Sequence, residues 1–248
     1  EYSFISIFLL VIKKPNYIYF FGFKVYYYNT KLTNKMKEDN TYTINMVKNH
    51  IRTLNVIDEN VLNTLKTIPR KIFVPKLYES FSHVDISIPI GFNQFMLMPS
   101  VEAKILQGMD IKKDEDVLVV GSGTGYLSTC VSSLANRVHS IDIIKSFVDS
   151  SRQMTNKISS KNMIFESQNI LDNLSIIRNY KVIIVTMAMD DMDIILDNMN
   201  NNARSFIFFS EKNQPIQKGA IIHKTNKSSF IKEFILETHV ESILTEKI

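Results

Sequence analysis

Between Val117 and Phe209, short apolar runs alternate with segments in which apolar residues recur every three or four positions. Such runs are typical of strands buried on both faces, and the segments between them are typical of helices. Because parallel strands need a crossover between them, the alternation predicts an α/β fold with a doubly wound, mostly parallel sheet. The predicted strands cover 117–120, 137–141, 163–166, 181–186 and 205–209, and the predicted helices cover 125–134, 146–158 and 192–199.

The region after these elements has a different pattern. Residues 220–223 and 230–239 are strand-like, and no helical pattern separates them. We therefore expect an antiparallel hairpin at one edge of the sheet.

The region before them is predicted to be mainly helical. Apolar residues at helical spacing indicate a helix from Thr43, with Ile44 and Val47 on its apolar face, and a second helix that has Asp58 as its N-cap. A third predicted helix covers 101–109, whereas 73–75 and 86–91 are expected to be extended or turn-forming. We accordingly divide the body into a helical N-terminal extension, 36–100, and a core, 101–248.

Residues 1–35 differ from the rest of the chain. Their apolar run, 4–12, and their aromatic-rich run, 17–28, are both shorter than the roughly 20 residues of a membrane span. The charges of Lys13 and Lys14 follow the apolar run, whereas a signal peptide has them in front. We expect this leader-like segment to lie outside the native domain, which would begin at Met36; the alternative is a short membrane-surface anchor.

Charge and cysteine content narrow the class of protein. The net charge is +4, but residues 1–35 hold five of the 29 basic residues and one of the 25 acidic ones, so 24 of each remain in the body. A neutral body does not favour nucleic acid as a partner. The single cysteine, Cys130, excludes an internal disulfide and a cysteine-based metal site, and the five histidines are scattered. We expect a cytoplasmic, monomeric protein with no metal, nucleic-acid or membrane partner.

A glycine-rich turn follows the strand 117–120. Its sequence, Gly121-Ser122-Gly123-Thr124-Gly125, permits a tight turn in which a ligand lies against bare backbone at a helix N-terminus. Asp142 ends the next strand, 21 residues after Gly121, where a carboxylate can accept hydrogen bonds from both hydroxyls of a ribose. The spacing G-x-G-x-G and the terminal hairpin favour S-adenosylmethionine over a dinucleotide.

Several further motifs give the chain from Met46 onward a specific resemblance. They are Ile68-Pro69-Arg70, Phe73-Val74-Pro75, Ile88-Pro89-Ile90-Gly91, the glycine turn and Ile183-Ile184-Val185-Thr186. With these motifs the chain resembles the protein-L-isoaspartate O-methyltransferase family. The resemblance implies a Rossmann-like class I methyltransferase that transfers a methyl group from S-adenosylmethionine to the carboxylate of L-isoaspartyl residues in damaged proteins or peptides, a repair reaction.

The resemblance also suggests which residues form the site. The expected cofactor-binding residues are Gly121, Ser122, Gly123, Gly125, Asp142, Ile143 and Asn169. The acceptor would lie near Thr186 to Ala188 under the segment 89–99, with Gln94, Asp85 and Thr186 as polar candidates. A structural role is open for each of them: Asp85 capping a turn, Gln94 bracing the loop and Thr186 satisfying strand ends.

The chain departs from the family pattern near the acceptor. Leu97 stands where the family has the serine credited with the active-site role, and Gln168-Asn169 replaces a usual Gly-Asp pair near the adenine. Val119 and Lys181 likewise stand at positions that are acidic in the family. The variant resembles a bacterial branch in which the serine is also replaced. Two further hypotheses therefore stay open: a protein that binds S-adenosylmethionine without turnover, and a methyltransferase for another acceptor.

Overall fold

The computed structural model describes residues 17–20, 23–26, 30–158, 160–209, 216–226 and 229–242, with side chains from residue 39 onward. The chain divides into two compact units, Glu1–Tyr42 and Thr43–Ile248. In the first unit, strands β1 (Tyr17–Phe20) and β2 (Phe23–Tyr26) pair antiparallel. Residues 1–16, 21–22 and 27–29 of the leader-like segment lie outside the described residues. Its exclusion from the native domain and the boundary at Met36 stay predictions.

The first helix is longer than the sequence pattern indicates. Helix α1 (Thr30–Asn49) begins well before the expected start at Thr43. Residues 30–42 are mostly polar, and apolar periodicity cannot detect a helical segment that has no apolar stripe. On its predicted apolar face Val47 is buried, but Ile44 is 40% exposed, so that part of the prediction is wrong.

The second helix follows its sequence signal closely. Helix α2 (Glu59–Thr67) begins after Asp58, whose carboxylate accepts hydrogen bonds from the backbone N–H groups of Asn60 at 2.7 Å and Val61 at 3.1 Å. These bonds satisfy N–H groups that have no partner within the helix, which is why aspartate is favoured there. The predicted N-cap is confirmed. The other helices are α3 (Pro99–Met109), α4 (Tyr126–Leu134), α5 (Lys145–Lys157) and α6 (Asp193–Leu196), with the 3-10 helices η1 (Ile51–Leu54), η2 (Arg70–Phe73), η3 (Lys76–Phe81), η4 (Ile170–Asp172) and η5 (Leu174–Asn179).

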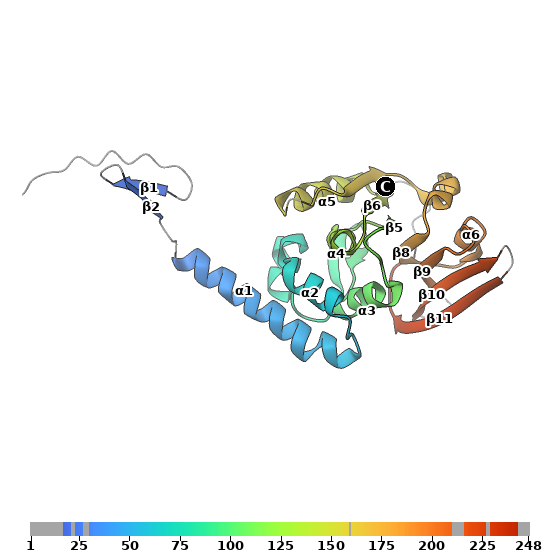
Figure 1. Cartoon of the computed structure of the whole chain (residues 1–248), viewed down its shortest axis with the longest axis horizontal. Coiled ribbons are helices and arrows are strands. Elements are labelled where there is room, and N and C mark those ends of the chain that lie inside the picture. Colours follow the sequence, from blue (N-terminus) through green and yellow to red (C-terminus); the bar gives the residue numbers. More distant parts are fainter. Residues whose placement is uncertain are drawn as a thin grey trace, which may run out of the picture. The chain divides into compact units, whose positions relative to one another are not determined.

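A seven-stranded sheet forms the centre of the second unit (Figure 1). Its order is β11-β10-β9-β8-β5-β6-β7, and the neighbouring strands from β9 to β7 are parallel. The antiparallel hairpin β10–β11 forms one edge, drawn in red in Figure 1. The doubly wound fold and its edge hairpin are therefore confirmed. The strands are β5 (Asp116–Val120), β6 (Arg137–Asp142), β7 (Met163–Ser167), β8 (Val182–Met189), β9 (Arg204–Phe209), β10 (Gln217–Asn226) and β11 (Ser229–Thr238).

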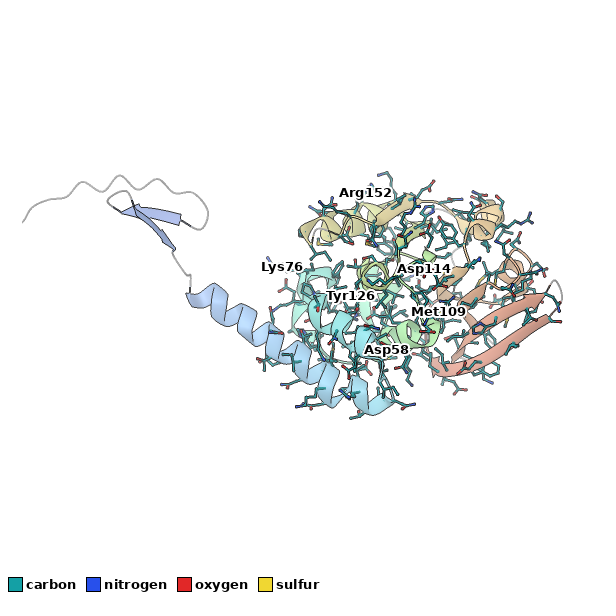
Figure 2. All side chains as sticks on the ribbon, in the orientation of Figure 1. Asp58, Lys76, Met109, Asp114, Tyr126 and Arg152 are labelled. Atoms are coloured by element: carbon teal, nitrogen blue, oxygen red, sulfur yellow. The ribbon has the colours of Figure 1, made fainter. Side chains whose placement is uncertain are left out.

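Alternate residues of the strands enter two separate hydrophobic cores. In β5, Val117 and Val119 pack with apolar residues of α2, α3 and α4, whereas Leu118 and Val120 pack with those of η4, η5 and α6. Both faces of the sheet are covered, as its continuous apolar strands require. Figure 2 shows Tyr126 and Met109, which are both fully buried, inside this unit.

The predicted helix over 192–199 is only partly correct, because α6 contains just Asp193–Leu196. The ammonium group of Lys224, from β10, donates a hydrogen bond to the carbonyl of Leu196 at 2.7 Å. A cation that binds the last carbonyl groups stabilises a helix end at that point. Met199 is nevertheless buried in the second core.

A small hairpin precedes α3. Strands β3 (Ile88–Gly91) and β4 (Gln94–Met96) pair antiparallel, and the two turn residues, Phe92 and Asn93, both have φ of +53°. Positive φ at both central positions matches the twist of a two-residue hairpin. The segment 89–99, which is predicted to cover the acceptor, therefore consists mainly of a β-hairpin. No helix among the described residues combines the length and apolarity needed to cross a bilayer.

Candidate active site

The glycine turn lies where the carboxyl end of β5 meets α4. Gly121 has φ of +90°, and a Cβ atom there would overlap the side chains of Thr186 and Met187. Gly123 has φ of +50°, but its Cβ would meet only one atom within 4 Å, Cδ1 of Ile90 at 3.5 Å. Packing thus requires glycine at 121, whereas at 123 the backbone is left uncovered toward the neighbouring pocket.

Asp142, at the end of β6, holds this turn in place. Its Oδ2 accepts hydrogen bonds from the Gly123 N–H at 2.9 Å and the Ser122 hydroxyl at 3.2 Å, and its Oδ1 accepts one from the Ile144 N–H at 2.9 Å. A carboxylate has about four lone-pair positions, so about one remains for a ligand hydroxyl, and not two for both hydroxyls of a ribose as the sequence predicts. Burial raises the pKa of Asp142, because it disfavours the charged form more than these hydrogen bonds favour it.

One pocket collects most of the predicted site residues. Its lining includes, among the predicted residues, Gln94, Leu97, Gly121, Ser122, Gly123, Asp142, Ile143, Asn169 and Thr186. Gly125 does not line it; a Cβ at that position would approach Ser151 at 2.8 Å, so we assign Gly125 to the packing between α4 and α5. Two elements far apart in the sequence, the glycine turn and the hairpin β3–β4, thus lie around the same pocket.

Two of the predicted polar residues also make structural contacts. Asn169 is buried, and its Oδ1 accepts a hydrogen bond from the Leu171 N–H at 3.0 Å at the start of η4. Thr186 donates to the carbonyls of Gly121 at 2.9 Å and Val120 at 3.1 Å, which joins β8 to the glycine turn. Both residues line the pocket as well, so a structural contact does not remove either from the candidate site.

Asp85 lies outside the pocket lining. Its Oδ1 accepts a hydrogen bond from the Ser100 N–H in the first turn of α3 at 2.8 Å, and its Oδ2 lies 2.9 Å from Nε2 of His50. These contacts lower the pKa of Asp85 in spite of its partial burial. We infer that Asp85 fixes the start of α3, which is a structural role but not the local turn cap that the sequence left open.

Several pocket residues were not predicted. Glu102 of α3 and Tyr126 of α4 are both at most 2% exposed and line the pocket. Glu102 had a usable signal, because it shares a helical face with Ile105, Leu106 and Met109 and is the one charged residue on that face. Further lining residues that were not predicted include Ser87, Phe147 and the segment 239–242, and no local sequence pattern marks these as part of a site.

The segment 239–242 follows β11 and passes beside β8. The backbone N–H of Ala188 donates to the carbonyl of Glu241 at 2.9 Å, and Ala188 forms a parallel bridge with Ser242. The side-chain oxygen of Gln217 accepts from the Val240 N–H at 2.9 Å, which anchors the segment to β10. The end of the described chain thereby forms one wall of the pocket.

The pocket is chemically suited to S-adenosylmethionine. Uncovered backbone at Gly123, a carboxylate with a remaining acceptor position and the apolar side chains of Ile143 and Phe147 lie around one space. A nucleoside needs such a combination of polar partners for its ribose and apolar surface for its base. Among the described residues, no cluster of three histidine, cysteine, aspartate or glutamate side chains could hold a metal ion.

Comparison with known proteins gives a consistent family. The relatives include protein-L-isoaspartate O-methyltransferases from Dictyoglomus turgidum, 29% identical over 134 residues, and Methanoculleus marisnigri, 33% identical over 108 residues. These matches cover 54% and 44% of this chain, and 61% and 49% of the relatives' lengths. The chain thus matches about half to three-fifths of each relative.

Solved structures show the same fold. A Plasmodium falciparum structure described as a protein-L-isoaspartate O-methyltransferase in complex with S-adenosyl-L-homocysteine has a TM-score of 0.70 and 19% identity, with 82% of this chain and 99% of that one covered. Another structure named protein-L-isoaspartate O-methyltransferase has a TM-score of 0.68 and 20% identity, with 79% and 64% covered. The model of the protein-L-isoaspartate (D-aspartate) O-methyltransferase family matches residues 41–240. The chain therefore belongs to this family.

Proposed function

We propose that the protein transfers a methyl group from S-adenosylmethionine to the carboxylate of L-isoaspartyl residues in damaged proteins or peptides. The observation that carries this proposal is the shared pocket, in which the uncovered backbone of Gly123 and the carboxylate of Asp142 face the residues of the hairpin β3–β4. Family membership supplies the acceptor chemistry. A donor site and an acceptor site next to each other are what a direct transfer requires.

The reaction needs little from the protein besides binding and alignment. The cofactor, when bound, supplies a methyl group on a positively charged sulfur. A carboxylate acceptor has an ordinary pKa near 4 and is ionised at neutral pH, so no general base is required. The proposed tasks of the chain are to hold the ribose through Asp142, to pack the base against Ile143 and to exclude water beneath the hairpin β3–β4.

Two measurements test this function. Calorimetric titration with S-adenosylmethionine reports cofactor binding, and transfer of a tritiated methyl group to an isoaspartyl peptide reports turnover. The matched control is the same peptide with an ordinary aspartate. We expect binding, and methylation of the isoaspartyl peptide alone; binding without methylation of either peptide would refute the proposed acceptor.

Leu97 keeps a second candidate function open. Leu97 lines the pocket at the position of the family's serine. Its side chain has no N–H or O–H group that could donate a hydrogen bond to the methyl acceptor. A protein that binds the cofactor without turnover, or a methyltransferase for a different acceptor, would show cofactor binding with no isoaspartyl methylation. Screening small carboxylic acids, amines and phenols for methyl uptake would then separate these two.

We also propose a setting for this activity. A cytoplasmic protein is consistent with the single buried thiol of Cys130. We further propose that its substrates are proteins or peptides, that the protein is a monomer and that it has no nucleic-acid partner. Size-exclusion chromatography with light scattering tests the monomer, since a mass near twice 28.7 kDa would contradict it.

A further inference from the structure

A buried, hydrogen-bonded arginine and glutamate lie next to the acceptor side of the pocket. Arg70 of η2 and Glu102 of α3 are 1% and 2% exposed, and Nη1 of Arg70 donates to Oε2 of Glu102. Nη2 of the same guanidinium group donates to the backbone carbonyl of Leu97 at 2.7 Å. One rigid group therefore joins Glu102 to the residue that stands at the family's serine position.

The second oxygen of Glu102 has no such partner. No hydrogen bond from the described residues reaches its Oε1, although the side chain lines the pocket. The hydroxyl of Tyr126, which lines the same pocket, is buried beside the thiol of Cys130, a weak hydrogen-bonding group, and no stronger partner from the described residues reaches it. Buried polar groups are nearly always paired, so unpaired ones that line a pocket indicate where a ligand or water binds.

The surroundings of Glu102 favour its neutral form. Burial raises its pKa to about 8, although the charge of Arg70 acts in the opposite direction, and the charge of Asp85 raises the pKa further. The facing groups on α4 are Tyr126 and Cys130, and burial raises the pKa of both, so they are uncharged near neutrality. Because Oε2 accepts from Arg70, the proton of a neutral Glu102 belongs on Oε1.

We propose that Glu102, as a neutral carboxylic acid, donates a hydrogen bond from Oε1 to the carboxylate of the methyl acceptor and so supplies the donor that Leu97 lacks. This inference rests on the proposed function. A carboxylic acid kept neutral in an apolar site is an effective donor to a negatively charged oxygen. Ionised Glu102 would instead place a negative charge beside the acceptor.

The transfer step balances without a proton passing to or from Glu102. One oxygen of the acceptor carboxylate accepts the hydrogen bond, and the other forms the new bond to the methyl carbon. The bond between that carbon and the positively charged sulfur breaks, and its electron pair stays on sulfur. Glu102 is therefore an acceptor-binding residue, and it is protonated before and after the step.

The test compares pH profiles of three variants. Glu102→Gln keeps a donor and an oxygen for Arg70 but does not titrate, whereas Glu102→Leu removes both. The control Glu115→Gln changes another arginine-paired glutamate, bonded to Arg204 at 2.6 and 2.7 Å, that does not line the pocket. Each is assayed for KM and kcat with an isoaspartyl peptide between about pH 6 and pH 9, across the range where Glu102 titrates. Thermal melting of each variant checks that it is folded.

The expected pattern separates donation from packing. In the wild type and in Glu115→Gln, the KM for the peptide rises by up to about tenfold per pH unit above pH 8, while it stays level in Glu102→Gln. In Glu102→Leu the KM is raised roughly ten- to a hundredfold at every pH. A wild-type KM that does not change with pH, or a Glu102→Gln variant as impaired as Glu102→Leu, would overturn the inference.

A second readout is independent of activity. Infrared spectra with isotope-labelled glutamate should show a protonated carboxyl band at neutral pH that disappears in Glu102→Gln, and its absence from the wild type would overturn the inference. If the band is present but the wild type methylates no isoaspartyl peptide, the proposed function fails and the neutral state of Glu102 stands. The two failures are thus distinguishable.

Discussion

The glycine turn provides a sharp test of cofactor binding, through the substitution Gly123→Ala. The added methyl group would meet only Cδ1 of Ile90, at 3.5 Å, so the fold itself has room for it. The cost to the free protein comes from the left-handed backbone, φ +50°, which disfavours a side chain by roughly 1–2 kcal/mol. The pocket, by contrast, loses the space in which a ligand contacts bare backbone.

Gly91→Ala is the matched control. Gly91 has φ of +100°, a Cβ atom there would have nothing within 4 Å, and the residue does not line the pocket. Its substitution therefore adds the same methyl group and a backbone cost of at least similar size without touching the cofactor. We expect both variants to lose roughly 1–2 kcal/mol in free energy of unfolding, measured by urea denaturation.

Only Gly123→Ala should also lose affinity for S-adenosylhomocysteine. We expect a loss of about tenfold or more, equivalent to about 1.4 kcal/mol, in a calorimetric titration. Wild-type affinity in Gly123→Ala would refute the assignment of Gly123 to the cofactor site. Equal losses in both variants would show that backbone strain, and not the occupied space, weakens binding.

Three further substitutions test other parts of the site. Asp142→Ala should weaken cofactor binding by about 1–3 kcal/mol and act mainly on the cofactor KM, because a ribose hydroxyl loses its acceptor; a loss confined to kcat would contradict this role. Leu97→Ser should raise kcat/KM for an isoaspartyl peptide roughly two- to tenfold, since it adds one donor, and a lower value would show that leucine is the better residue there. The raised pKa of Glu102, about 8 against an ordinary 4.5, means that the folded state binds the proton more tightly. The contribution of Glu102 to the free energy of unfolding therefore falls as pH rises from about 4.5 to 8, by at most about 1.4 kcal/mol per pH unit. In urea denaturation at several pH values, Glu102→Gln should lack this pH dependence.

The elements that the sequence predicts well depend on local signals. Asp58 caps α2 through its own neighbours, and β5 is recognisable because apolar side chains on both faces leave a continuous run. The glycine turn is equally local, since its conformation needs residues without side chains at fixed positions. These features place one side of the pocket from the sequence alone.

The remaining parts depend on contacts between distant segments. The end of α6 is set by Lys224, which is 28 residues further along the chain, and the start of α1 has no apolar stripe to mark it. Glu102 belongs to a correctly predicted helix, but its partner is 32 residues earlier, and only the assembled structure places its carboxyl group on the pocket. The acceptor side is therefore where sequence reasoning was least complete.

The segment 239–242 is the part of the pocket lining that is synthesised last. The glycine turn and the hairpin β3–β4 leave the ribosome well before this segment, yet the pocket lacks a wall until Ala188 pairs with Glu241. A chain folded through β9 but lacking this segment would leave the pocket open on the side that residues 239–242 line. These are the last described residues to be synthesised, so the exclusion of water that the proposed methyl transfer needs would be complete only after this segment has been translated.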